Sequence, residues 1–253
     1  MWKWVIITVL TLIVLIVLYF ALSPHNELTV VSGYWKIKSK HTDDEYDKWF
    51  NNTLSLNSPY VFFYDDEFTK ERISKFRGQI PTTYIKRPIS SFTSSKSYKD
   101  SWVHDVHVPT PELGKIWIEK VAMMNEAIKI NPYKSDWFAW VDAGNAYYRD
   151  DKPPSYPWPS SNILSKLPKD KIVYVGTNVK EHDFAGAVFI YHKNIAEKVH
   201  QLFFEQYSLC SVEHDDWQCG HDQCIFTDLK KRHPDLFHRM GDGYGGNLLS
   251  FIK

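Results

Sequence analysis

The sequence predicts an α/β fold in which a mainly parallel sheet is flanked by helices. Short apolar runs, rich in β-branched and aromatic residues, alternate along the chain with longer stretches whose apolar residues recur at helical spacing. This alternation is typical of parallel sheets, because each crossover helix returns the chain to the same end of the sheet. The 253 residues suit one large domain or at most two small ones.

Six segments are expected to be strands. Each is short and apolar, and several end at Gly or Asp. They are residues 28–34, 59–64, 82–86, 137–141, 171–175 and 185–191.

Four segments are expected to be helices. A capping-box pattern at residues 42–45 starts the first, and the second is a long amphipathic helix from Glu112 to the stop signal Asn131-Pro132. The third covers residues 195–203, and the last starts near Asp222 and ends before His233. Residues 87–111 and 150–160 have no period and are expected to be long loops, which often bind ligands.

The N-terminal segment has the properties of a membrane anchor. Residues 5–22 carry no charge, and eighteen helical residues span about 27 Å. A cleaved signal peptide is the competing interpretation, but Pro24 should hinder cleavage after Ser23. We therefore expect an anchor at 1–22, a short linker at 23–27 and a catalytic domain at 28–253.

The expected orientation is type II, a single-pass protein with its domain in the lumen of an ER- or Golgi-like compartment. Lys3 and the free amino terminus favour a cytoplasmic N-terminus, although Lys36, Lys38 and Lys40 on the other side oppose it.

Charge and motifs exclude several classes of function. Lys and Arg together number 30, as do Asp and Glu, so the formal net charge is zero and gives no support to a phosphate-backbone binder. GxSxG, HExxH and EF-hand patterns do not occur, which argues against the hydrolases and calcium sites that use them.

The three cysteines lie close together in the sequence. Cys210, Cys219 and Cys224, with His214 and His221, permit a zinc site, but their spacing matches no common zinc module. One disulfide plus one free thiol fits a lumenal domain equally well.

Polar residues that follow the predicted strands mark a candidate site. Tyr34, Asp65 and Asp142 each come at or just after a strand end, and the carboxyl ends of parallel strands meet at one edge of the sheet. Asp142 runs into Ala143-Gly144, where a glycine lets a diphosphate approach the backbone. It is also common as a turn cap, and a single carboxylate is too few for a metal site.

Further candidates lie elsewhere in the chain. Asp222-Gln223 opens the last predicted helix and is either a helix cap or a reactive pair. Arg149 lies just beyond the Asp142 turn and suits a phosphate or a surface ion pair. Arg72 is a candidate phosphate contact, and His238 precedes a glycine-rich stretch at 240–247 that we expect to be a loop.

Several segments together resemble the HtrL/YibB-type family, whose members are classed with GT-A-like glycosyltransferases. The resemblance runs in order over about residues 28 to 251. It is carried by 29–35 (TVVSGYW), 137–149 (WFAWVDAGNAYYR), 184–188 (FAGAV), 221–226 (HDQCIF) and 232–237 (RHPDLF).

The resemblance implies a GT-A-like fold and metal-assisted sugar transfer from a nucleotide-sugar to a glycan, protein or lipid acceptor. Asp142 then corresponds to the acid of a DxD-type motif, and Asp222 with Gln223 to an Asp-Gln pair at the reaction centre. The sequence departs from a full DxD motif, because Gly144 stands where the second carboxylate is expected. Mn²⁺ or Mg²⁺ would then need another ligand, for which we expect His238, with Asp242 or Asp222 as alternatives. A reaction that uses no metal is the other alternative that the sequence leaves open.

The remaining expected contacts are with the donor: Tyr34, Asp65, Arg72, Gly144 and Arg149. Two other classes of function stay open at this point. One is a degenerate transferase fold that only binds a sugar or nucleotide, and the other is a zinc-stabilised structural protein.

Overall fold

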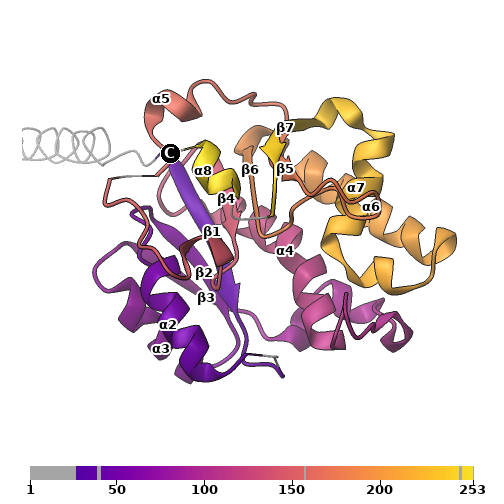
Figure 1. Ribbon diagram of the computed structural model, residues 1–253, viewed down its shortest axis with the longest axis horizontal. Coiled ribbons are helices and arrows are strands. Elements are labelled where there is room, and N and C mark those ends of the chain that lie inside the picture. The colour runs from indigo at the N-terminus through magenta and orange to yellow at the C-terminus, as the bar shows by residue number, and fades with distance from the viewer. Residues whose placement is uncertain (1–26, 39–40, 157, 245–246, 253) are drawn as a thin grey trace, which may run out of the picture.

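The computed structural model describes residues 27–38, 41–156, 158–244 and 247–252, and a mixed sheet runs through their centre (Figure 1). Within these residues the sheet has seven strands in the order β3-β2-β1-β4-β6-β5-β7. The strands are β1 (Leu28–Tyr34), β2 (Tyr60–Tyr64), β3 (Thr82–Lys86), β4 (Trp137–Val141), β5 (Ile172–Gly176), β6 (Val188–His192) and β7 (Phe237–Asp242).

The expected mainly parallel sheet is confirmed, with one strand reversed. β1, β2, β3 and β4 pair in parallel, as do β5 and β7, whereas β6 runs antiparallel to both β4 and β5. The connection from β5 to β6 covers residues 177–187 and contains no helix. A parallel crossover usually needs a helix, so this short connection favours an antiparallel neighbour.

The helices cover both faces of the sheet. They are α2 (Asp43–Thr53), α3 (Glu67–Arg77), α4 (Pro111–Ile130), α5 (Ser161–Leu164), α6 (Ala196–Glu213), α7 (Asp222–Arg232) and α8 (Asn247–Phe251). The predicted capping box is present, with Thr42 and Glu45 bonding each other's backbone N–H groups. Asn131 ends α4 in the left-handed conformation.

Alternate strand residues enter two apolar cores. Val31, Phe138 and Trp140 pack with α4, α6 and α7 on one face. Val30 and Ala139 belong to the other core, which is completed by α2, α3, α5 and α8. Figure 1 shows α2 and α3 on one side of the sheet and α4, α6 and α7 on the other.

Four helices and strands of the structure are absent from the sequence-based prediction: α3, α5, α8 and β7. Helix α3 has a buried arginine, Arg77, whose guanidinium donates hydrogen bonds to the carbonyls of Leu54, Leu56 and Ser58. Because a charged residue takes a core-facing position, the helix sequence lacks a clear apolar stripe. Strand β7 contains Gly241 and includes part of the predicted glycine-rich loop, so the interpretation of that part as a loop is wrong. The predicted strand at 185–191 also begins later, at Val188.

The cysteines form a disulfide between Cys210 and Cys219, and Cys224 is a buried free thiol. This arrangement is one of the two alternatives that the sequence permits. It argues against structural zinc, because two of the three thiols are used. Over the described ranges of the chain, no group of three or more His, Cys, Asp or Glu side chains is arranged to hold a metal ion.

The expected anchor at residues 5–22 lies outside the described residues. Within the described ranges, none of the helices combines the length and the apolar character that a bilayer crossing requires.

Candidate active site at the carboxyl edge of the sheet

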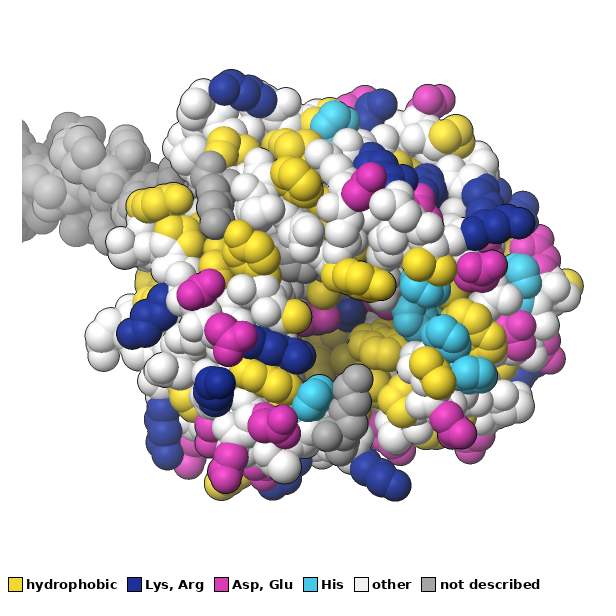
Figure 2. Space-filling view, viewed as in Figure 1, with side chains coloured by type: hydrophobic (Ala, Val, Ile, Leu, Met, Phe, Trp, Pro, Cys, Tyr) yellow, Lys and Arg dark blue, Asp and Glu magenta, His cyan; other side chains and the backbone are white. Residues whose placement is uncertain are grey.

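The candidate residues Tyr34, Asp65 and Asp142 lie at one edge of the sheet, as predicted. They end or follow β1, β2 and β4, which are mutually parallel neighbours. Figure 2 shows a hollow on this face of the molecule, with acidic and basic side chains at its floor and histidines along one side. In open α/β sheets this edge is where ligands bind.

A buried lysine joins the two carboxylates that the sequence singled out. Lys120 Nζ lies 3.2 Å from Asp142 Oδ1 and 3.0 Å from Asp222 Oδ2, and it donates a hydrogen bond of 3.0 Å to the carbonyl of Gly186. The side chains of Lys120 and Asp222 are each 3% exposed, whereas that of Asp142 is 35% exposed. Asp142 is therefore the member of this bridge that a ligand can reach most easily.

The charge of Lys120 is maintained by its partners. Burial alone would lower the pKa of its amine, but the carboxylates of Asp142 and Asp222 outweigh this effect and raise the pKa above its ordinary value. An ammonium group therefore lies between two carboxylates in a largely buried setting. The amphipathic pattern of α4 does not reveal it, because a lysine is normally assigned to the solvent face.

Asp142 and Asp222 are held by their local backbone. The Trp140 indole donates to Asp142 Oδ1 at 2.7 Å, and the Asp142 N–H donates to the carbonyl of Ala187 at 2.9 Å. Asp222 is the first residue of α7, where the helix dipole favours a negative charge. Its Oδ1 accepts from the N–H of Gln223, which places the predicted Asp-Gln pair at the bridge.

Gly186 permits the close approach of Asp222. A Cβ atom at this position would lie 2.6 Å from Asp222 Oδ2, closer than carbon and oxygen can pack. Segment 184–188 contributes to the HtrL/YibB-type resemblance and overlaps the strand predicted at 185–191, but neither observation assigns Gly186 a role at the site.

Arg149 and Gly144 lie at the same edge. The Arg149 guanidinium lies over the Trp49 ring, 3.6 Å from its centroid, and its Nε donates to the carbonyl of Gly144 at 3.2 Å. This contact fixes a second cationic group beside the Asp142 turn.

Arg72 is occupied by neighbouring carboxylates. It bonds Asp47 at 2.6 Å and lies 3.5 Å from Asp43, with its side chain 11% exposed. It also approaches the Tyr34 hydroxyl at 3.4 Å. Arg72 therefore positions Tyr34 rather than offering a free phosphate contact.

Asp65 keeps an unused acceptor. Its Oδ1 is buried, and within the part of the chain that the structure describes it has no hydrogen-bond partner. Burial, followed by the neighbouring carboxylate of Asp66, raises the pKa of Asp65. Asp66 caps α3 and Glu67 bonds Lys70, so only the first residue of this acidic run is available to a ligand.

His238 does not approach Asp142, so the expectation that they share a metal is wrong. His238 pairs with Val173, Val173 with Ile190, and Ile190 with Ala139, which places His238 level with a residue three positions before Asp142. Three strand spacings also separate β7 from β4, about 14 Å. The position of His238 was not predictable from the sequence, because strand β7 was not recognised there.

A divalent metal fits these residues poorly. Mn²⁺ or Mg²⁺ needs several oxygen ligands at about 2 Å. One oxygen of Asp142 already faces Lys120 and Trp140, and the nearest carboxylate, Asp222, is joined to the same ammonium. Gly144 supplies no second carboxylate, and Asp242 bonds Arg239 instead.

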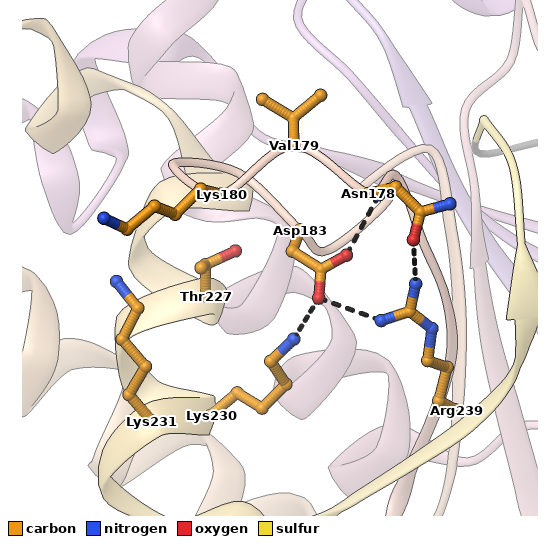
Figure 3. A pocket seen from close by; sticks show the side chains of 8 residues that line it. All are labelled: Asn178, Val179, Lys180, Asp183, Thr227, Lys230, Lys231 and Arg239. Carbon is orange, nitrogen blue, oxygen red and sulfur yellow. Dashed lines mark hydrogen bonds and ion pairs between the residues drawn. The ribbon is translucent and has the colours of Figure 1, made fainter.

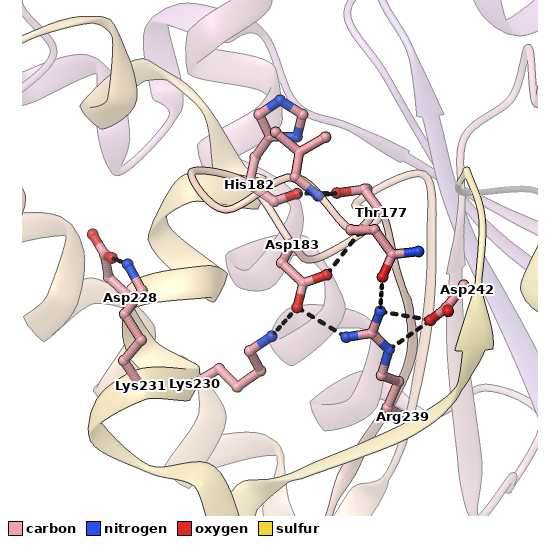
Figure 4. Close-up of polar contacts among 10 residues, drawn as sticks. Thr177, His182, Asp183, Asp228, Lys230, Lys231, Arg239 and Asp242 are labelled. Atoms are coloured by element: carbon pink, nitrogen blue, oxygen red, sulfur yellow. Dashed lines mark hydrogen bonds and ion pairs between the residues drawn. The ribbon is translucent and has the colours of Figure 1, made fainter.

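A cavity of about 380 Å³ lies beside the site, between the 177–183 loop, α7 and β7 (Figure 3). Its lining includes four cations, namely Lys180, Lys230, Lys231 and Arg239. Carboxylates offset most of this charge, as Asp183 bonds Lys230 and Arg239, Asp228 bonds Lys231, and Asp242 bonds Arg239 (Figure 4). We interpret the cluster as a tie that holds the loop to α7 and β7, rather than as an anion site.

Comparisons with known proteins bear on the fold. No protein-family model and no curated protein matches the sequence. Among solved structures, mouse xyloside xylosyltransferase 1 in its apo form is similar, with a TM-score of 0.51, 15% identity and 84% of each chain covered. The fold is GT-A-like.

Other solved structures are more distant. Core-mannan synthase A from Aspergillus fumigatus has a TM-score of 0.46 and 10% identity over 84% of this chain and 72% of that chain. A cytidylyltransferase from Leptospira borgpetersenii has a TM-score of 0.43 and 10% identity over 87% and 77%. Identities this low concern the fold alone, and the HtrL/YibB-type resemblance stays a prediction.

Proposed function

We propose that this chain is a glycosyltransferase that moves a sugar from a nucleotide-sugar donor to an acceptor hydroxyl. The observation that carries the proposal is the Asp142–Lys120–Asp222 bridge, which lies at the edge of the sheet where α/β folds bind their ligands. The likeness in fold to a xylosyltransferase supports the same class of reaction.

The donor would span the site from the β1–β2 side to Asp222. The half-buried Tyr34 and the unused Oδ1 of Asp65 suit the nucleoside. Gly144 and Arg149 suit the diphosphate, because a cation fixed beside an open backbone stabilises the charge that develops on the leaving group. The sugar would then lie over Asp142 and Lys120.

In the reaction, the bond between C1 of the sugar and the departing phosphate oxygen breaks, and a bond between C1 and the acceptor oxygen forms. The acceptor proton passes to Asp222 in an inverting reaction, or to the departing phosphate in a retaining one, where Asp222 would stabilise positive charge at C1. Gln223 would hydrogen-bond the sugar or the acceptor. We derive no step through a divalent metal, because the residues present fit one poorly.

We also keep the membrane topology as a proposal. Residues 5–22 would anchor the chain, with the catalytic domain in the lumen. The Cys210–Cys219 disulfide supports this compartment, because disulfides persist where the environment is oxidising.

The proposal is tested by nucleotide release from a panel of UDP-, GDP- and CMP-linked sugars, with and without Mn²⁺, using purified full-length protein. We expect release from at least one donor, and a loss of at least about 100-fold in Asp142→Ala and in Asp222→Ala. Asp170→Ala, a change of an exposed aspartate, is the matched control and should release nucleotide at the wild-type rate.

Two results would count against the proposal. Saturable donor binding without nucleotide release would favour the alternative function, a degenerate binding module. The absence of the second carboxylate of the DxD motif is consistent with that alternative. Neither binding nor release from any donor would refute the nucleotide-sugar assignment for this panel.

A further inference from the structure

Six ring side chains form a continuous surface beside Asp222, which we call the ring wall. They come from four separate segments: the loop before α4, α4 itself, the 177–183 loop, and the turn that leads into α7. The residues are His104, His107, Trp117, His182, Trp217 and His221.

The rings of the wall contact one another in a chain. His107 and Trp217 are stacked with centroids 4.0 Å apart and an interplanar angle of 16°. His182 lies 5.8 Å from His221, and Trp117 lies 5.0 Å from His221. All but His221 are partly exposed, and Figure 2 shows the histidines gathered along one side of the hollow.

The segments that carry the wall are fixed in place. Cys219, two residues after Trp217, is tied to α6 by the disulfide with Cys210. His104 and Val108 exchange backbone hydrogen bonds of 2.9 and 2.8 Å. The 177–183 loop is held by the ion pairs of Asp183. These ties hold apolar rings at the surface, where they gain less from burial than they would in a core.

Two of the imidazoles in the wall, those of His107 and His221, are held toward the neutral form. Burial, with His104 and His182 nearby, lowers the pKa of His107. Burial, with His182 and Lys120 nearby, lowers the pKa of His221 to about 3. A neutral imidazole offers one donor and one acceptor. The Nδ1 atoms of His182 and His221 are buried and, over the described ranges, have no hydrogen-bond partner.

This combination is complementary to a sugar ring. The electron-rich face of an aromatic ring attracts the C–H groups on one face of a pyranose. Free imidazole nitrogens next to the rings can bond its hydroxyls. The aromatic faces of Trp117 and Trp217 offer a phosphate no positive charge, so the wall suits an uncharged sugar better than it suits the diphosphate of a donor.

The position of the wall separates it from the donor side. Tyr34 and Asp65 lie beyond β1 and β2, whereas the wall is built on α4, the β5–β6 connection and the start of α7. The Asp142–Lys120–Asp222 bridge lies between the two. His221 directly precedes Asp222 in the chain, so the wall leads to the proposed reaction centre.

We propose that the ring wall is the acceptor site, and that it binds an uncharged sugar residue against the outer face of the stacked Trp217–His107 pair, with a hydroxyl directed toward Asp222. This inference rests on the proposed function. It names the acceptor as a neutral glycan end rather than a peptide side chain or a lipid phosphate.

Saturation-transfer NMR tests the proposal with full-length protein and methyl glycosides of xylose, glucose, galactose and mannose. At least one glycoside should receive saturation from aromatic protein protons. Trp217→Ala and His107→Ala should each weaken its binding by about tenfold, equivalent to about 1.4 kcal/mol. Tyr156→Ala changes an exposed aromatic residue outside the wall and should bind as the wild type does.

The affinity for UDP or GDP, measured by calorimetry on the same variants, separates the two proposals. Unchanged nucleotide binding in Trp217→Ala shows that the variant is folded, and Trp217→Phe should retain part of the glycoside binding. Absence of glycoside binding, or binding that is equal in Trp217→Ala, His107→Ala and wild type, overturns the acceptor site. Glycoside binding without any nucleotide binding would refute the donor assignment and leave the wall intact.

Discussion

Lys120 balances the charge of the site, since its ammonium lies within 3.2 Å of two carboxylates in a buried setting. Both carboxylates are visible in the sequence, because each opens or follows a predicted element. The lysine is not, since its burial depends on α4 packing against β4 and α7. The chemistry-bearing acids were therefore predictable, and the cation that joins them was not.

Replacing Lys120 by methionine should strongly destabilise the fold. The substitution keeps the length of the side chain but leaves Asp142 and Asp222 facing each other without a counter-ion. Breaking a buried pair in this way costs about 3–5 kcal/mol, and urea unfolding measures the loss. Lys129→Met, on the same helix with an exposed ion pair to Glu197, is the control and should cost less than about 1 kcal/mol. Equal losses in the two variants would contradict the bridge.

The element scale shows where sequence patterns suffice. Strands β1, β3 and β4 have the predicted bounds. The apolar runs of β1 and β4 are largely buried, whereas β3 is an edge strand whose residues are partly or fully exposed, and its bounds follow from its β-branched and aromatic residues. β7 escapes prediction because its glycine and charged residues suit an edge strand as well as a loop. His238 was misplaced for the same reason, since its register becomes visible only once β7 pairs with β5.

The 177–183 loop should depend on Asp183. Its carboxylate bonds Lys230 on α7, Arg239 on β7 and the N–H of Asn178 within the loop. Asp183→Asn removes the charge that these partners share, so amide hydrogen exchange at residues 177–183 should accelerate by about tenfold. Asp228→Asn, which loses contacts only to Lys231 and His214, should leave exchange in the loop unchanged. Equal exchange rates at residues 177–183 in the two variants would refute the stabilising role of Asp183.

The end of β6 should give the protein an acid sensitivity. Burial lowers the pKa of His192, whose ring packs edge-on against Trp137 at 5.1 Å. The unfolded chain binds a proton near pH 6.5 and the folded chain binds it only at lower pH. The contribution to stability is therefore complete above about pH 6.5 and is lost as the pH falls below it.

His192→Phe keeps a ring against Trp137 but removes the titration. Between pH 7 and pH 5 its free energy of unfolding should fall less steeply than that of the wild type, by up to about 1.4 kcal/mol per pH unit. His233→Phe changes an exposed histidine and should follow the wild-type slope. Denaturant unfolding at both pH values measures the difference. If the free energy of unfolding falls equally with pH in His192→Phe and in the wild type, His192 is not the source of the acid sensitivity.

At the scale of the whole molecule, the proposed donor and acceptor sites lie on opposite sides of the charged bridge. β1 and β2 present Tyr34 and Asp65, α4 and α7 present the charged bridge, and the ring wall follows on the far side of Asp222. The sequence predicted the edge on which these groups meet. It did not predict the wall, because its rings come from four segments that only the tertiary fold brings together.

The proposed topology makes a prediction for the full chain in membranes. If residues 5–22 anchor a lumenal domain, protease added to sealed microsomes should leave residues 28–253 intact, and detergent should make them digestible. An antibody against the C-terminus reports the fragment. Digestion without detergent would place the domain on the cytoplasmic side and contradict the type II orientation.

A crystal structure with bound UDP or GDP would reveal whether the donor binds over the Asp142–Lys120–Asp222 bridge. We predict that the base lies near Tyr34 and Asp65 and that the diphosphate lies beside Gly144 and Arg149, with its terminal phosphate directed toward Asp142. A nucleotide bound elsewhere, for example in the cavity between Lys180 and Arg239, would contradict donor binding at the bridge.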